Sequence, residues 1–190
     1  MQSFINEYLY DLTDLEIQAI LKLEKTIENK LKNGQQPFLS ELVCIASYKE
    51  LLQFSWINLI STSKEIDKLK RIQILEPEEE EKIKKDIPTL LKIKNNISSK
   101  VQKQYEENPY PRWVNLGLSI YPKSLYMITK ELKLKIRKSY IRELKIPKVL
   151  IAGCGTGQNS IGTASMFRDS DILSIVLSLK SLSYAKRKTK

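Results

Sequence analysis

The residues with the clearest capacity for chemistry are three glycines at alternate positions, Gly153, Gly155 and Gly157, in the segment KVLIAGCGTGQNS. They directly follow the apolar run Val149 to Ala152, which suits a buried parallel strand. Glycines permit a tight turn and let a ligand lie against bare backbone, and a helix that begins after them offers unpaired N–H groups to an anionic group. The pattern predicts a cofactor-binding loop.

The spacing within the loop narrows the class of ligand. A phosphate-binding P-loop would end in GK[ST] and a dinucleotide loop would read GxGxxG, whereas this loop reads GxGxG. GxGxG after a strand is typical of S-adenosylmethionine enzymes, whose cofactor carries a methionine carboxylate in place of a pyrophosphate. A purely structural glycine turn has the same spacing, so the loop alone leaves that alternative open.

A second motif, QYEENPYPRW (Gln104–Trp113), precedes the loop. Together with VLIAGCGTGQNSIGTAS and LSLKSLSYAKRKT it resembles the bacterial class I S-adenosylmethionine-dependent methyltransferases that carry such a segment. The resemblance is greatest to the rickettsial-type protein-lysine methyltransferases that act on outer-membrane proteins. The matching motifs begin at about residue 101, and the preceding residues correspond to the helical region of that family.

The resemblance implies a set of cofactor contacts. The glycines approach the amino-acid moiety of the cofactor, while Tyr105, Arg112 and Trp113 fold over the pocket. Arg112 would bind the carboxylate through a charge-assisted bidentate contact. The implied cofactor-binding residues are Gly153, Gly155, Gly157, Thr156, Gln158, Arg112, Tyr105 and Trp113. A proline-rich packing turn would also explain Trp113, and a surface charge would explain Arg112. No catalytic residue and no metal ligand is assigned.

One departure from the family lies at the end of the second predicted strand. In this fold an acidic residue there, roughly 20 residues after the glycines, holds the ribose hydroxyls. The family has IDLS, whereas this chain has IVLS with Val176 at the acidic position. Leaving these hydroxyls unpaired costs about 1–3 kcal/mol, or roughly ten- to a hundredfold in affinity. We therefore expect no measurable S-adenosylmethionine binding by this chain.

The other departure is length. A doubly wound methyltransferase sheet continues for several strands after the second, and these carry the adenine pocket and the substrate-lysine channel. Two parallel strands alone leave open hydrogen-bonding edges. We therefore expect a truncated N-terminal fragment of a methyltransferase whose parent substrate is a protein. The fragment is expected to be inactive alone, or to be completed by a separately encoded C-terminal half as its partner.

The predicted organisation has three parts. Residues 1–100 form a helical region, and residues 101–147 hold the QYEENPYPRW connector and a basic helix, SLYMITKELKLKIRKSYIREL. Residues 148–190 form an incomplete cofactor-binding βαβα unit. The predicted fold class is therefore an α-helical N-terminal region followed by the truncated start of a Rossmann-like α/β fold.

Several local signals place the elements of the helical region. Thr13 and Glu16 are spaced as a capping box for a first long helix. The apolar block 39–70 is expected to hold the centre of the helical core, with its aromatic residues and Cys44 buried. The acidic run after Pro77 is predicted to be the exposed start of a further helix, where negative charge meets the helix dipole.

Composition bounds the remaining possibilities. Of 190 residues, 42% are hydrophobic and 28% are charged, which is typical of a soluble globular protein. No apolar run approaches the roughly 20 residues of a membrane span, and no secretory signal is visible, so we expect a cytoplasmic protein. Histidine is absent and the two cysteines lie far apart, which argues against a His/Cys metal site and a Ser-His-Asp triad.

The net charge of +10 is concentrated in KELKLKIRKSYIRELKIPK (Lys130–Lys148) and in the terminal KRKTK. It is interpreted either as an electrostatic footprint for nucleic acid or as a solvated helix face in a lysine-rich protein. The alternative function is therefore a basic helical nucleic-acid-binding or assembly protein without catalysis. Because the lysines lie in no known nucleic-acid motif, nucleic acid is not the expected partner.

Overall fold

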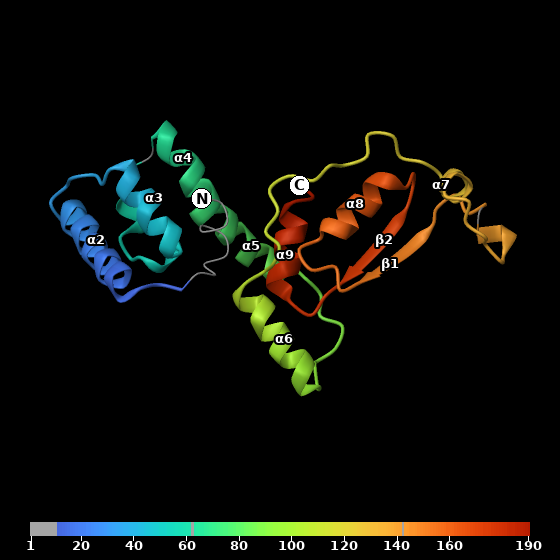
Figure 1. Ribbon diagram of the computed structural model, residues 1–190, viewed down its shortest axis with the longest axis horizontal. Coiled ribbons are helices and arrows are strands. Elements are labelled where there is room, and N and C mark those ends of the chain that lie inside the picture. The colour runs from blue at the N-terminus through green and yellow to red at the C-terminus, as the bar shows by residue number, and fades with distance from the viewer. Residues whose placement is uncertain (1–10, 62, 142) are drawn as a thin grey trace. The chain divides into compact units, whose positions relative to one another are not determined.

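The computed structural model describes residues 11–61, 63–141 and 143–190 (Figure 1). The chain divides into two compact units, Met1–Glu79 and Glu80–Lys190. The described residues of the first unit form helices and turns only, whereas the second unit combines helices with two parallel strands. Among the described helices, none combines the length and the apolar character that crossing a membrane requires.

Helix α2 (Asp14–Lys32) opens the first unit with the predicted capping box. The backbone N–H of Glu16 donates to Thr13 Oγ1 at 3.3 Å, and the N–H of Thr13 donates to the Glu16 carboxylate at 2.9 Å. These hydrogen bonds from Thr13 lower the pKa of Glu16. The cap fixes where the helix begins, as the sequence predicts.

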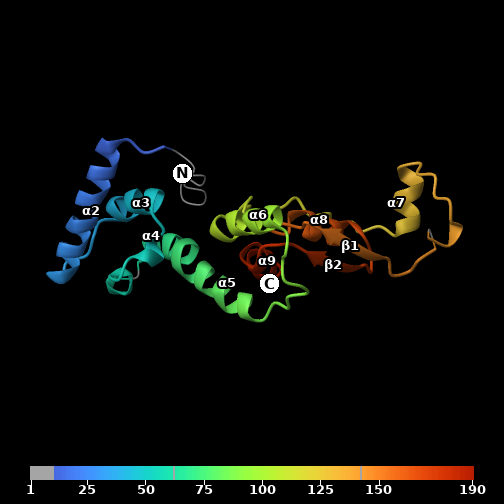
Figure 2. The same cartoon turned by 90° about the horizontal axis from the view of Figure 1, so that it is seen from below.

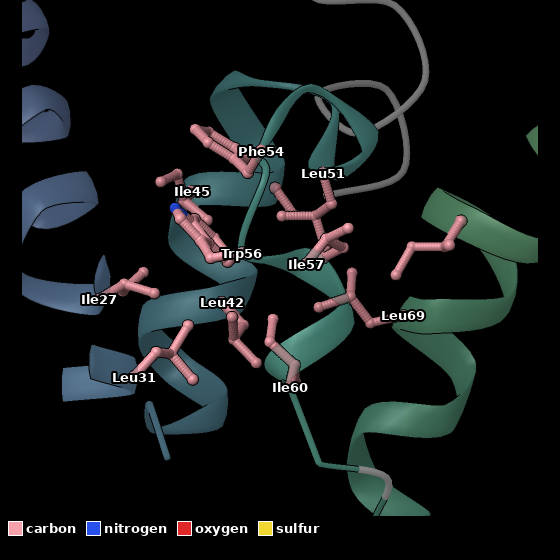
Figure 3. Packing of buried hydrophobic residues seen from close by; sticks show 12 residues of the cluster. Ile27, Leu31, Leu42, Ile45, Leu51, Phe54, Trp56, Ile57, Ile60 and Leu69 are labelled. Atoms are coloured by element: carbon pink, nitrogen blue, oxygen red, sulfur yellow. The ribbon is translucent and has the colours of Figure 1, made fainter. Parts of the chain in front are cut away.

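The apolar block 39–70 folds into several short helical elements. Its helices are α3 (Leu39–Tyr48) and α4 (Lys64–Lys70), separated by two 3-10 turns at Leu51–Gln53 and Ile57–Leu59. The prediction that this block holds the helical core is confirmed. Figure 3 shows the cluster that the pieces build with α2 and the turn after α4, which comprises Ile27, Leu31, Leu42, Ile45, Ala46, Leu51, Phe54, Trp56, Ile57, Ile60, Leu69 and Ile74.

The aromatic residues of this block pack, as predicted, whereas the prediction for its cysteine is wrong. The Phe54 and Trp56 rings stack with their centroids 4.6 Å apart, and both side chains are buried. Cys44 is exposed, because Leu42 and Ile45 occupy the buried face of α3 and position 44 falls outside it. Its side chain is therefore open to solvent reagents.

The predicted Glu-rich first turn at Pro77 agrees with the bounds of α5 (Glu76–Lys85), whose first turn holds Glu76, Glu78 and Glu79. Helix α4 leads through a π-helical turn at Arg71–Leu75 directly into α5, so the helical segment is continuous across this start. A proline inside a helix cannot donate a hydrogen bond to the preceding turn, and the wider π turn just before it accommodates this loss.

In the second unit, two strands pair in parallel. The elements in chain order are α6 (Asn96–Glu107), α7 (Leu125–Glu131), β1 (Lys148–Ala152), α8 (Gln158–Met166), β2 (Asp171–Ile175) and α9 (Leu179–Arg187). The strands lie side by side in Figures 1 and 2, with Leu150 opposite Leu173. The predicted order of strand, helix, strand, helix is confirmed. Within the described residues the sheet has two strands, which form a small parallel α/β part.

The predicted basic helix is wrong over most of its length. Only α7 is α-helical, Lys133 has a left-handed backbone with φ +52°, and a single 3-10 turn follows at Ser139–Ile141. The spacing of Ile128, Leu132 and Ile136 is compatible with a helix, but Leu132 and Leu134 are exposed. A helix over these residues would therefore gain little from packing of an apolar face.

Candidate functional site

A cavity of about 390 Å³ lies in the second unit, where the glycine loop, the end of β2 and the QYEENPYPRW segment meet. Its wall therefore combines both motifs that carry the family resemblance. The lining residues are Val101, Tyr105, Tyr110, Pro111, Gly153, Cys154, Gly155, Thr156, Gln158, Asn159, Val176, Leu177 and Ser178.

The structure brings most of the predicted cofactor residues to this cavity. Those that line it are Tyr105, Gly153, Gly155, Thr156 and Gln158. Three others, Arg112, Trp113 and Gly157, lie in the same two motifs but are not part of the lining. Their contacts, described below, belong mainly to the framework around the cavity.

The three loop glycines all have a left-handed backbone, but they serve different purposes. Their φ angles are +77°, +52° and +85° at Gly153, Gly155 and Gly157. A Cβ added at Gly153 would meet no atom within 4 Å, so this glycine leaves open space beside the cavity. A Cβ at Gly157 would lie only 2.5 Å from the Cβ of Ala185. Gly157 therefore permits the close packing of α9 against the loop.

The loop is fixed to the second strand by its backbone. The N–H groups of Gly153 and Cys154 both donate to the carbonyl of Ile175, at 2.8 and 3.1 Å. Helix α8 then begins at Gln158, and no side chain caps its first turn. The amino end of α8 consequently faces the cavity side of the loop with N–H groups available to an acceptor.

The segment Asn108–Trp113, which we call the strap, is bonded to the loop and to α9. The Trp113 indole N–H donates to the carbonyl of Thr156 at 3.0 Å, and Thr156 Oγ1 donates to the carbonyl of Pro111 at 2.6 Å. The Tyr184 hydroxyl of α9 donates to the carbonyl of Trp113, and the two rings meet edge to face with centroids 5.9 Å apart. Trp113 therefore has a packing role, as the alternative interpretation of this residue expects.

Arg112 stands apart from this network. Its Nε is buried and has no hydrogen-bond partner among the residues that the structure describes. A buried donor without an acceptor costs roughly 1–3 kcal/mol, more when it is charged. The strap therefore holds a guanidinium group whose Nε–H donates to no acceptor among the described residues.

Helix α6 is tied to the start of α9 by its last turn. Ser178 Oγ donates to the carbonyl of Tyr105 at 3.0 Å, and Glu106 accepts from the N–H of Lys180 at 3.0 Å and from Lys84 Nζ at 2.8 Å. Burial alone would raise the pKa of Glu106, but the hydrogen bonds from Lys84, Lys180 and Ser178 lower it. A carboxylate at the first turn of α9 also complements the helix dipole.

A buried ion pair between α5 and α9 was missed by the sequence reasoning. Glu80 Oε1 accepts from Arg187 Nε at 2.8 Å, and the two side chains are only 6% and 9% exposed. The acidic run was predicted to be an exposed helix start, which is wrong for Glu80. No local signal could have revealed this, because its partner lies far along the chain.

The two sides of the cavity differ in chemical character. On the side of the loop, the start of α8 has no side-chain cap and Gly153 leaves open space, and both features suit an anionic group. The lining contains no Asp or Glu, and the end of β2 contributes the aliphatic Val176 and Leu177. Asn159 is a polar lining residue that the motif comparison did not single out.

One further lining group is a thiol. Cys154 is 7% exposed, and burial raises its pKa, although a hydrogen bond with Ser160 opposes this effect. A protonated thiol is a weak nucleophile, so this residue contributes packing to the cavity wall.

Comparisons of the chain with protein-family models, curated proteins and solved structures found no match. The methyltransferase resemblance and the roles of the cavity residues therefore stay predictions.

Proposed function

We propose that residues 101–190 form the cofactor-binding beginning of an S-adenosylmethionine-dependent methyltransferase related to enzymes that modify protein lysines. The observation that carries this proposal is the cavity in which Tyr105, the strap and the glycine loop meet. Two motifs that are distant in the sequence, and that were selected for their resemblance to such enzymes, line one cavity. If the glycine loop had only a structural role, there would be no reason for the two motifs to line the same cavity.

The amino-acid end of the cofactor is assigned to the side of the cavity formed by the loop and the start of α8. Gly153 leaves the space, and the first turn of α8 offers N–H groups to the carboxylate. Arg112 of the strap is proposed to supply the balancing charge, because its Nε is buried without an acceptor among the described residues. This role requires its side chain to turn toward the cavity, because Arg112 is not among the lining residues. The strap keeps its position through Trp113 and Thr156.

The side of the cavity assigned to the ribose lacks an acidic residue. Val176, at the end of β2, lines the cavity where an acidic residue would accept the two ribose hydroxyl protons. The aliphatic side chain forgoes these hydrogen bonds, which weakens binding roughly ten- to a hundredfold. We therefore expect this chain to bind the cofactor too weakly to measure.

Catalysis needs more than the cofactor. When bound, S-adenosylmethionine supplies a methyl group that passes from its sulfonium to a lysine amine by in-line displacement. The protein must hold the deprotonated amine in line with that methyl group. The cavity lining contains no carboxylate to accept a proton from the amine, and the described sheet has two strands. Methyl transfer is therefore proposed to require additional strands beyond β2, in further polypeptide.

Calorimetric titration with S-adenosylmethionine tests the assignment. We expect no measurable binding by the unaltered chain and a gain of roughly ten- to a hundredfold in affinity on Val176→Asp. Val114→Asp is the matched control, because Val114 is half exposed and outside the cavity lining. Micromolar binding by the unaltered chain would refute the role given to Val176. An equal response of the two variants would refute the placement of the ribose.

A further inference from the structure

The chain between the strap and β1 presents an unusual surface. Residues 120–141 and 143–147, called here the basic segment, are attached to the rest of the second unit at Lys123, whose N–H and carbonyl bond to Met166 and Arg168 at 2.9 Å each, and at Pro147, whose carbonyl accepts from the N–H of Asp171 at 3.0 Å. Large apolar and aromatic side chains along this segment are exposed to solvent. They include Ile120, Tyr121, Tyr126, Leu132, Tyr140 and Ile146.

Lysines accompany these apolar side chains. Lys130, Lys133 and Lys135 are exposed and line a shallow cavity of about 340 Å³ together with Tyr126 and Leu134. The nearby carboxylate of Glu131 is already paired with Lys123 at 2.7 Å. The three lysines around the cavity therefore give the surface a local excess of positive charge.

This combination identifies the class of partner. Exposed apolar patches on soluble proteins mark binding surfaces, and Leu132 and Ile146 are 63% and 60% exposed. A bilayer with anionic headgroups satisfies both features, since lysines bind the phosphates, aliphatic side chains enter the acyl boundary and tyrosines lie at the headgroup level. Nucleic acid would satisfy the lysines alone and leave the aliphatic side chains in water.

We propose that the basic segment binds the surface of an anionic phospholipid bilayer peripherally. The lysines around the 340 Å³ cavity contact the headgroups, Leu132 inserts between Lys130 and Lys133, and Ile146 supplies a second exposed aliphatic side chain of the same segment. This activity uses none of the residues that line the larger cavity at the glycine loop, so it holds or fails independently of the methyltransferase proposal.

Co-sedimentation of the full chain with vesicles tests the proposal. We expect binding to vesicles of phosphatidylcholine with phosphatidylserine, loss of that binding as salt rises, and little binding to phosphatidylcholine alone. Each lysine near an anionic surface changes the partition coefficient between vesicles and water about fivefold. The triple variant Lys130→Glu/Lys133→Glu/Lys135→Glu is therefore expected to lower this coefficient on the order of a hundredfold or more.

Two further variants separate this mechanism from simple charge attraction. Leu132→Ser/Ile146→Ser keeps the charge and is expected to lower vesicle binding about tenfold or more. Lys22→Glu/Lys25→Glu/Lys68→Glu makes the same change in net charge at exposed positions of α2 and α4, and is expected to change binding less than about threefold. Circular dichroism verifies that each variant is folded.

The proposal is overturned by any of three results. The first is a chain that stays in the supernatant with anionic vesicles at low salt. The second is equal loss of binding in the two triple lysine variants, which would show attraction without a defined surface. The third is unchanged vesicle binding by Leu132→Ser/Ile146→Ser together with tighter binding to a single-stranded RNA probe, which would make the segment a nucleic-acid interface.

Discussion

Replacing Gly157 with alanine tests the packing of α9 against the glycine loop. The φ angle of Gly157 is +85°, and an added Cβ would lie 2.5 Å from the Cβ of Ala185 and 3.3 Å from its Cα. Contacts below 3.0 Å do not persist, so the helix backbone would have to move. Gly153→Ala is the matched control, since its φ is +77° and its Cβ would meet no atom within 4 Å.

The two substitutions share one cost and differ in another. A left-handed backbone costs a residue other than glycine about 1–2 kcal/mol, and this applies at both positions. Gly157→Ala adds the cost of overpacking against α9, which is about 1–3 kcal/mol. The free energy of unfolding is therefore expected to fall by about 1–2 kcal/mol for Gly153→Ala and by about 2–5 kcal/mol for Gly157→Ala.

Urea unfolding followed by hydrogen exchange and mass spectrometry measures this difference. Peptides from residues 148–190 report on the second unit separately from the helical core of the first. With a urea dependence of about 1–3 kcal/mol per molar, the midpoint for Gly157→Ala should lie about 1 M below that for Gly153→Ala.

A double substitution makes the test specific to the contact. Ala185→Gly removes the clashing Cβ, at a cost of about 1 kcal/mol for glycine in a helix. Combined with Gly157→Ala, it should cost less than the sum of the two single changes. Equal losses for Gly153→Ala and Gly157→Ala, or strict additivity in the double variant, would refute the packing role of Gly157.

The buried ion pair, the Glu106 carboxylate and the two thiols give further tests. Arg187→Met removes the guanidinium from the buried Glu80 and is expected to cost about 3–5 kcal/mol in urea unfolding, whereas replacing both residues by apolar ones should cost less; equal costs would contradict this. Because folding lowers the pKa of Glu106, its stabilisation is complete above the ordinary value of 4.5 and is lost as the pH falls through the lower folded value. Glu106→Gln should reduce this acid dependence, and an unchanged pH profile of unfolding would argue against it. Exposed Cys44 should react with iodoacetamide before buried Cys154, whose pKa burial raises, and peptide mapping that finds the reverse order would contradict the burial of the loop.

Local signals in the sequence predicted much of the secondary structure, because local bonds decide where those elements begin. The Thr13–Glu16 capping box stands where it was expected, and the apolar run before Gly153 forms the predicted strand. The prediction that this strand is buried is wrong, because Leu150 is 61% exposed and no layer of the described residues covers it. The position of Gly153 and Gly155 follows from the same local reasoning, since a glycine loop after a parallel strand lies at the end of the sheet. The family resemblance, not a local signal, implied that Tyr105 lies beside them, and all three residues line one cavity.

Features set by distant contacts were not predictable. Glu80 resembles its acidic neighbours in the sequence, and only the approach of Arg187 buries it. Gly157 fits the cofactor pattern as well as Gly153 does, yet the position of Ala185 gives it a packing role. The basic helix failed for a different reason, since its apolar spacing is compatible with a helix but Leu132 and Leu134 are exposed to solvent.

The bonds that hold the strap have a consequence for how the cavity arises during protein synthesis. Trp113 finds a partner in Tyr184, which leaves the ribosome much later. Until α9 has emerged, the nascent strap lacks this long-range bond, and loop-closure entropy opposes its ordering. The helical core of the first unit draws on residues that precede Glu80 and is free to form while the cavity residues are still being translated.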